Sequence, residues 1–179
     1  MMKNTFEFLL IKTFLALLVF ILFMPSTALT ADKRELLGSY RNWDAFVITH
    51  DSGDKTCYMV STPTSTRPAN ANRGDIYTMV TIRPRVKIVD EVNIVMGYPL
   101  RASSDVTSTI GARKFKMFTE GSGAWLRTPR EDRDMVAAMR AGSRLTTQGT
   151  STRGTNTTDQ YSLLGFTAAH NAIKEACQS

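Results

Sequence analysis

Histidine and cysteine are scarce in this chain of 179 residues, which has two of each. His50 and His170 are far apart, and neither has a second histidine three or four residues away. Cys57 and Cys177 have no neighbouring cysteine or histidine at the spacing of a zinc site, and the chain has no Cys-x-x-Cys redox motif. The sequence therefore predicts neither a metal centre nor a cofactor.

Signature motifs of catalysis are also missing. The chain has no G-x-S-x-G nucleophile elbow, no phosphate-binding P-loop and no glycine pattern for a dinucleotide. No spacing favours a Ser/His/Asp triad. We therefore expect no catalysis. The alternative is a periplasmic hydrolase with an unrecognised site, which would need a cleft containing His50, His170 or paired carboxylates.

Neither sign of charge is in large excess. The chain has 22 Lys and Arg against 16 Asp and Glu, a net charge of +6, and the basic residues are dispersed along it. This pattern does not favour nucleic acid as a partner. It fits an anionic envelope surface or an acidic partner protein better.

Long hydrophobic runs are absent except near the N-terminus. Residues 14–24 carry no charge, follow Lys3 and Lys12, and precede Pro25 and a small-residue stretch. This order is typical of a secretory signal peptide, and the run is about half of the ~20 residues that a membrane anchor needs. We expect a signal peptide over residues 1–28, with cleavage after Ala31 as the alternative, and a product that is not an integral membrane protein.

Export bears on the two cysteines, because cysteines usually pair in an oxidising compartment. The alternatives are two buried thiols, a redox or metal pair, and a nucleophilic Cys57, which would have to be free and activated. We expect a Cys57–Cys177 disulfide. It would close a loop of about 120 residues and fasten the C-terminal segment to an early strand.

The rest of the chain predicts one domain over residues 42–179, after a polar lead-in at 29–41 with room for a short helical turn. Thr128-Pro129-Arg130-Glu131 has the form of a capping box and predicts a helix over 129–141. A second helix is expected where Phe166, Ala169 and Ile173 recur on one face. Strands are expected at 42–49, 56–62, 76–82, 91–98, 105–110 and 114–119, and twice within 143–163. Hairpin-sized turns between them favour an antiparallel β-sandwich.

Arg73-Gly74-Asp75 spells the tripeptide that integrin receptors read on adhesive proteins. A surface adhesin that uses these three residues is therefore a further alternative. The simpler interpretation is a turn before the strand at 76–82, with glycine at the bend and two charges facing water.

Several segments together resemble the invasion-associated locus B family, which consists of exported alphaproteobacterial proteins. They are NWDAFVIT, KTCYMVSTP, NRGDIYTMVTIRP, VNIVMGYP, KFKMFTEGSGAWLR and GTSTRGTNTTDQYSLLGFTAAHNAIKEAC. The resemblance runs from about residue 40 to the end. It implies an immunoglobulin-like β-sandwich in the periplasm or envelope, and a contribution to host-cell invasion in pathogenic members.

The resemblance brings no catalytic residues with it, and Cys57 and Cys177 match the family's cysteine positions. Unlike in antibody domains, Trp43 precedes the first cysteine and the second cysteine lies on a terminal helix, so an antibody-type binding mode is not implied. The expected function is that of a binding or interaction module whose partner is a protein or an envelope component.

Overall fold

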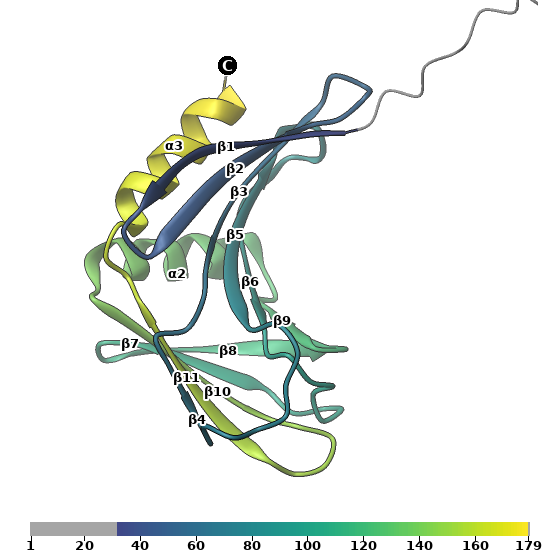
Figure 1. The fold of residues 1–179 in the computed structure, drawn as a ribbon, viewed down its shortest axis with the longest axis vertical. Coiled ribbons are helices and arrows are strands. Elements are labelled where there is room, and N and C mark those ends of the chain that lie inside the picture. Colours follow the sequence, from purple (N-terminus) through teal and green to yellow (C-terminus); the bar gives the residue numbers. More distant parts are fainter. Residues whose placement is uncertain (1–31, 179) are drawn as a thin grey trace, which may run out of the picture. The chain divides into compact units, whose positions relative to one another are not determined.

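Eleven antiparallel strands and two α-helices make up residues 32–178, the part of the chain that the computed structural model describes (Figure 1). The expected signal peptide lies outside these residues. The strands are β1 (Lys33–Tyr40), β2 (Trp43–Thr49), β3 (Lys55–Ser61), β4 (Ser65–Arg67), β5 (Tyr77–Arg83), β6 (Ile88–Val95), β7 (Val106–Ile110), β8 (Arg113–Glu120), β9 (Gly123–Trp125), β10 (Arg144–Thr150) and β11 (Asn156–Ser162). The helices are α2 (Pro129–Ala141) and α3 (Phe166–Gln178), and the 3₁₀ turn η1 spans Pro84–Val86. The prediction of a mainly β protein with a mid-chain and a C-terminal helix is confirmed.

The strands form one hydrogen-bonded sheet in the order β1-β2-β3-β5-β6-β9-β8-β7-β10-β11-β4. The first half of the sheet contains β1, β2, β3, β5, β6 and β9, and the second half contains β7, β10, β11 and β4. Strand β8 belongs to both halves, because its first residues pair with β7 and its last three pair with β9. Only residues 62–64 connect β3 to β4, and they can span roughly 14 Å at most. The far edge of the sheet must therefore return close to β3, which gives a sandwich-like arrangement.

Both helices cover the same side of the first half of the sheet. Helix α3 packs on β1, β2, β3 and β5, and α2 packs on β6 and β8. Alternation along the strands points Val47, Met59 and Val80 towards this side, where they are buried. At the base of α3 the buried Trp43 ring meets Phe166 edge-on at 4.9 Å, and its indole N–H donates to the Ser162 carbonyl at 3.0 Å. These contacts join the two halves of the sheet around one core.

The start of α2 confirms the predicted capping box. The Thr128 hydroxyl accepts from the Glu131 N–H at 3.3 Å, and the Glu131 carboxylate accepts from the Thr128 N–H at 3.0 Å. Two donors that the helix leaves without partners are thus satisfied by local sequence alone.

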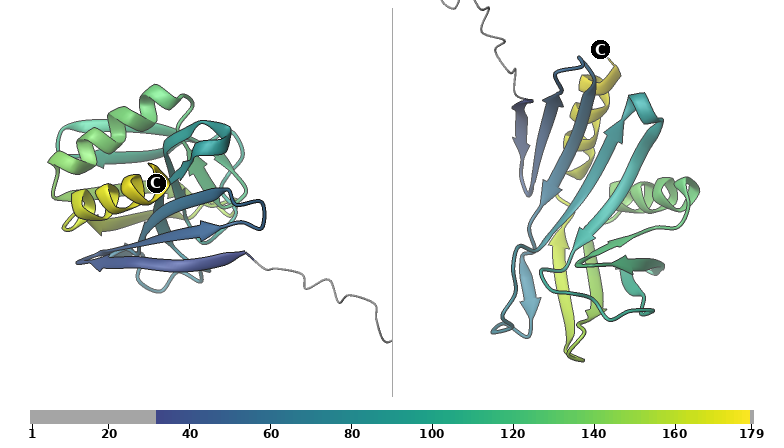
Figure 2. Two further views of the ribbon diagram at one scale, coloured as in Figure 1. Left: turned by 90° about the horizontal axis from the view of Figure 1, so that it is seen from above. Right: turned by 90° about the vertical axis from the view of Figure 1, so that its right-hand side faces the viewer.

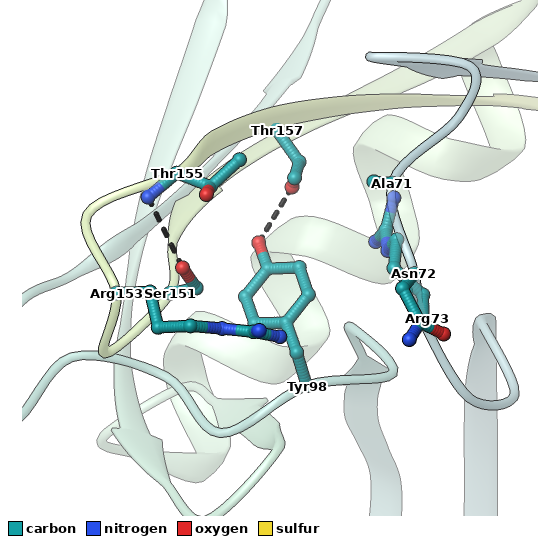
Figure 3. Close-up of a pocket in the computed structure, with 8 residues that line it drawn as sticks. All are labelled: Ala71, Asn72, Arg73, Tyr98, Ser151, Arg153, Thr155 and Thr157. Atoms are coloured by element: carbon teal, nitrogen blue, oxygen red, sulfur yellow. Dashed lines mark hydrogen bonds between the residues drawn. The ribbon is translucent and has the colours of Figure 1, made fainter.

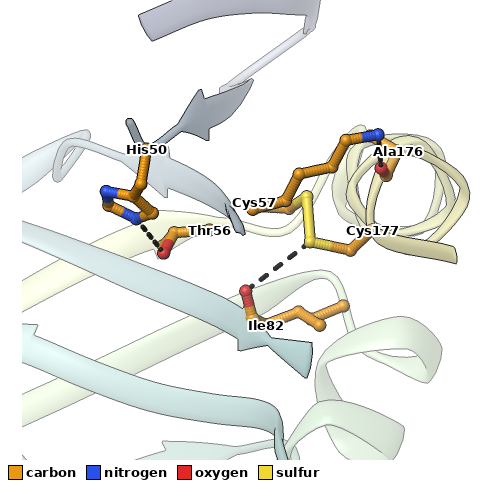
Figure 4. The surroundings of a disulfide bond; sticks show 7 residues. His50, Thr56, Cys57, Ile82, Ala176 and Cys177 are labelled. Carbon is orange, nitrogen blue, oxygen red and sulfur yellow. Dashed lines mark hydrogen bonds between the residues drawn. A yellow bond between two sulfur atoms is a disulfide. The ribbon is translucent and has the colours of Figure 1, made fainter. Parts of the chain in front are cut away.

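A disulfide joins Cys57 on β3 to Cys177 in the last turn of α3, with the two Cα atoms 6.0 Å apart (Figure 4). The pairing expected from the sequence is therefore present. Beside it the Lys55 ammonium donates to the Ala176 carbonyl at 3.2 Å. The C-terminal end of α3 is thus fastened to the strand beneath it.

Three strands were not expected. Residues 33–40, interpreted as a lead-in with a helical turn, form β1 and pair with β2. Strands β4 and β9 have three residues each and fall outside the ranges in which strands were expected. All three depend on a neighbouring strand for their conformation. β1 is an edge strand with mostly exposed side chains, so it lacks the alternation that reveals a half-buried strand.

Candidate functional site

The side of the first half of the sheet that faces away from the helices is apolar. Register places Phe46 opposite Tyr58, Val60 opposite Met79, and Tyr77 opposite Val95. Trp125 on β9 and Phe118 on β8 lie next in line and stack at 6.0 Å. Leu36 on β1 is opposite Phe46 and is 53% exposed. We call the following set the outer face: Leu36, Phe46, Ile48, Tyr58, Val60, Tyr77, Met79, Val95, Trp125 and Phe118. The strands that carry these residues are drawn as ribbons in the right-hand view of Figure 2.

Apart from Leu36, these side chains are half-buried, because they shield one another. Proteins in water rarely leave an apolar patch that crosses seven strands without a use for it, and such patches usually mark interaction sites.

A groove of about 500 Å³ runs along the middle of the outer face. Tyr58, Val60 and Met79 line it. The Phe46 and Tyr58 rings stack beside it at 5.1 Å with a 17° angle between their planes. Aromatic side chains held in this way lose little conformational freedom when a partner binds.

Charged groups of both signs border the outer face. The Arg34 guanidinium lies 5.6 Å from the Phe46 ring centre, and Arg127 lies at the same distance from the Phe118 ring. Arg83 and Glu91, which also line the groove, form an ion pair at 2.8 Å. The rim is therefore mixed in charge.

Both free edges of the sheet are poorly suited to pairing with another strand. Strand β1 begins with Lys33, Arg34 and Glu35 and has a register shift between Leu36 and Gly38. Strand β4, at the other edge, has only three residues. Charges, bulges and short edge strands are the means by which proteins prevent edge-to-edge association. Association by adding a strand to either edge of the sheet is therefore disfavoured.

The Arg73 side chain of the Arg73-Gly74-Asp75 tripeptide is committed to internal contacts. Its guanidinium donates to both carboxylate oxygens of Asp159, at 2.7 and 2.6 Å, and to the Met96 carbonyl at 2.9 and 2.7 Å. The side chains of Arg73 and Asp159 are only 4% and 0% exposed. Burial alone would lower the pKa of Arg73, but the hydrogen bonds and charge of Asp159 raise it above its ordinary value.

Gly74 and Asp75 are exposed beside this ion pair, and the Gly74 N–H donates to the Gly97 carbonyl at 2.7 Å. An adhesin that presents the Arg73 guanidinium to a receptor would first have to break a buried, bidentate ion pair. That requirement weighs against the adhesin alternative, which stays a hypothesis.

His50 lies near the start of β3 in a short chain of hydrogen bonds. Its Nδ1 is 2.8 Å from an Asp32 carboxylate oxygen, and its Nε2 is 2.9 Å from the Thr56 hydroxyl (Figure 4). A cavity of about 370 Å³ beside it is also lined by Arg83 and Arg85. The structure thus brings an acid, an imidazole and a hydroxyl together, a combination that the sequence spacing did not reveal.

His170 is buried between α3, α2 and β6. Its Nε2 is 2.7 Å from Asp90, and its Nδ1 is 2.9 Å from the Arg140 guanidinium. Because arginine only donates, Nδ1 must accept, and Nε2–H therefore donates to Asp90. This neutral tautomer links three elements of the core.

Two general properties of residues 32–178 complete the description. No group of three or more His, Cys, Asp or Glu in this range could hold a metal ion. None of the helices in the same range is long and apolar enough to cross a membrane.

The outer face was missed at the level of sequence, although a signal for it exists. The stretches FVI, CYMV and IYTMV place apolar side chains on both faces of their strands instead of alternating with polar ones. Trp125 lies half-buried on this face, whereas Trp43 is fully buried in the core.

Comparison with known proteins gives one match. No curated protein and no solved structure matches the chain. The model of the family described as Invasion associated locus B (IalB) protein matches residues 43–174, which is most of the chain. The chain therefore belongs to the Invasion associated locus B family.

Proposed function

We propose that this protein is an exported binding module of the periplasm or envelope, without catalysis of its own, that docks a protein partner on its outer face. The observation that carries the proposal is the apolar, half-exposed outer face with its groove of about 500 Å³. Any contribution to host-cell invasion would follow from this envelope interaction.

Export rests on three observations. The family is one of invasion-associated proteins. The Cys57–Cys177 disulfide suits an oxidising compartment, since cytosolic proteins rarely keep such bonds. Residues 1–28 have the pattern of a signal peptide. Together they support a periplasmic or envelope-associated location.

A protein fits the outer face better than a lipid surface does. Membrane-binding surfaces insert protruding apolar side chains, whereas Tyr58, Val60 and Met79 line a concave groove that accepts side chains from a partner. The Arg83–Glu91 ion pair at the groove is neutral overall, so it offers an anionic bilayer no net attraction. Mixed charge at the rim is common in contacts between proteins.

The outer face is large enough for a specific contact. Five strands of about seven residues (β1, β2, β3, β5 and β6) together with the three-residue β9 and the last three residues of β8 cover roughly 500 Å² in projection, at about 4.8 Å between strands and about 3.3 Å per residue. Because side chains project from the sheet, the solvent-accessible area of the outer face is larger than this projected area and approaches the ~800 Å² per partner of a standard interface. Within it the Phe46–Tyr58 stack is the natural energetic centre, because aromatic residues near the middle of an interface usually dominate binding.

The test is chemical crosslinking of the tagged protein in its native envelope, followed by mass spectrometry. Wild type and two variants are compared. Met79→Lys puts a charge in the groove, and Leu164→Lys puts the same charge on a side chain that is 63% exposed in the turn before α3. We expect a reproducible protein partner with wild type and Leu164→Lys, and its loss with Met79→Lys. Equal capture by all three proteins would refute the outer face as the docking site.

A hydrolase is the second candidate function, and the Asp32–His50–Thr56 chain of hydrogen bonds is the observation that favours it. Acid, imidazole and hydroxyl follow the same order as in a Ser/His/Asp triad. The test is labelling of the purified protein with a fluorophosphonate probe. The non-catalytic proposal expects no labelling, whereas labelling of wild type that is lost in His50→Gln and in Thr56→Val would establish the hydrolase instead.

A further inference from the structure

A cavity of about 220 Å³ opens beside the Arg73–Asp159 ion pair, away from the outer face. It lies between the loop that carries Ala71, Asn72 and Arg73, the Tyr98 ring, and the turn that joins β10 to β11 (Figure 3). Its volume holds about seven waters at the ~30 Å³ that each occupies in the liquid. Only a small group can enter it.

The floor of the cavity is rigid and close to neutral. The Tyr98 and Thr157 hydroxyls are 2.5 Å apart, and the Arg73 guanidinium lies 5.0 Å from the Tyr98 ring centre. The charge of Arg73 is balanced by Asp159. Burial raises the pKa of Tyr98, although its hydrogen bond to Thr157 and the charge of Arg73 oppose the shift, so the phenol stays neutral at physiological pH.

The rim, in contrast, carries positive charge without a counter-charge. Arg153 is exposed at the tip of the turn, and no acidic side chain of residues 32–178 pairs with it or with Arg101. The Arg101 side chain lies close to the same turn. Its Nη2 is so near Gly154 that a Cβ added to this glycine would be only 3.1 Å away. Arg153 lines the cavity itself, and Arg101 adds a second positive charge near the same turn.

Hydrogen-bond donors without partners complete the lining. The Ser151 oxygen accepts from the Thr155 N–H at 3.1 Å, which leaves its hydroxyl hydrogen available. The Thr155 hydroxyl and the Asn72 side-chain amide bond no other group in the described part of the chain. Guanidinium, hydroxyl and amide donors around a small opening are the groups that bind oxyanions in proteins.

We propose that this cavity binds a small oxyanion, a phosphate or carboxylate group, between Arg153 and the hydroxyls of Ser151 and Thr155. Arg153 supplies the charge and the hydroxyls supply direction, while the Tyr98 ring forms an apolar wall for the carbon or sugar attached to the anion. The volume is below the ~300 Å³ at which drug-sized sites begin, so the group is a terminal one. The proposal does not depend on the outer face.

The test is NMR titration of the purified exported protein with sodium phosphate, sodium acetate or sodium chloride at constant ionic strength. We expect saturable amide shifts in residues 151–155 and at Asn72 with phosphate or acetate, and none with chloride. Arg153→Gln should weaken binding about tenfold, because it removes a charge-assisted contact. Arg144→Gln, an exposed arginine at the other end of the same strand pair, should change it less than about twofold.

A second arm distinguishes a free anion from a lipid headgroup. Vesicles of phosphatidylglycerol are compared with phosphatidylcholine vesicles by co-sedimentation, again with both variants. Binding to phosphatidylglycerol that needs Arg153 but not Arg144 would assign the anion to a lipid. Equal shifts with chloride, or affinities that Arg153→Gln leaves unchanged in both arms, would overturn the proposal.

Discussion

Reduction of the Cys57–Cys177 disulfide should make this protein much less stable without unfolding it. The two cysteines are 120 residues apart, so the bond removes a large part of the freedom of the unfolded chain. The chain-entropy relation gives about 5 kcal/mol for a loop of that length at 25 °C, and measured losses for native disulfides range from about 2 to 5 kcal/mol. A domain of this size has a total stability of about 5–15 kcal/mol.

The fold should survive reduction because α3 has other anchors. Phe166, Ala169 and Ile173 are fully buried in the core. The last turn of the helix, in contrast, loses its covalent anchor to β3. We therefore expect faster amide hydrogen exchange in the last turn of α3 in the reduced protein.

Urea unfolding of oxidised and reduced wild type is the cleanest assay, because reduction alone leaves every side chain in place. At a slope of about 2 kcal/mol per molar urea, a loss of 5 kcal/mol lowers the midpoint by roughly 2.5 M. The double variant Cys57→Ala/Cys177→Ala should lose at least as much. A loss below about 1 kcal/mol on reduction would refute the loop-closure reasoning, and free thiols in the exported, unreduced protein would contradict the pairing itself.

Three other predictions concern the core. Arg73→Ala should lower the unfolding free energy by about 3–5 kcal/mol, because it leaves Asp159 buried without a counter-charge, and Arg73→Met with Asp159→Leu should recover most of that loss in urea unfolding. Burial raises the pKa of Asp132 to about 6, so its contribution to stability is present below its ordinary pKa and is lost as the pH rises through about 6. Asp132→Asn should accordingly exceed wild type by up to about 3 kcal/mol at pH 7.5 and match it near pH 4; equal pH profiles would contradict this. Gly165→Ala should lower the melting temperature far more than Gly53→Ala. Both positions have positive φ, but only a Cβ at 165 would overlap a backbone oxygen, that of Tyr40 at the end of β1.

Local signals were enough to predict some elements of this fold and not others. Helix α2 is specified within its own sequence, by the Thr128–Glu131 capping box and by apolar residues at helical spacing. Strands β2, β3 and β5 are rich in aromatic and β-branched residues. Strand β1 and the short strands β4 and β9 form because partners elsewhere in the chain hold them, and no pattern within their own residues reveals this.

The candidate sites depended still more on tertiary structure. The disulfide could be predicted because export and the cysteine count leave few alternatives. Arg73 and Asp159 are 86 residues apart, and no pattern near either residue indicates the other. The sequence therefore suggests a surface motif at Arg73, whereas the structure shows that this side chain belongs to a buried ion pair. The cavity beside this ion pair is likewise formed by residues from three separate loops, so no single stretch of the sequence predicts it.

The measurement that tests the central claim most directly is site-specific photocrosslinking in intact cells. A photoreactive phenylalanine derivative replaces Tyr58 at the centre of the outer face, or Leu164 in the turn before α3, one position at a time. The account predicts one protein adduct from position 58 and none from position 164. No adduct at position 58, the same adducts at both positions, or lipid adducts alone would contradict the claim that the outer face docks a protein partner.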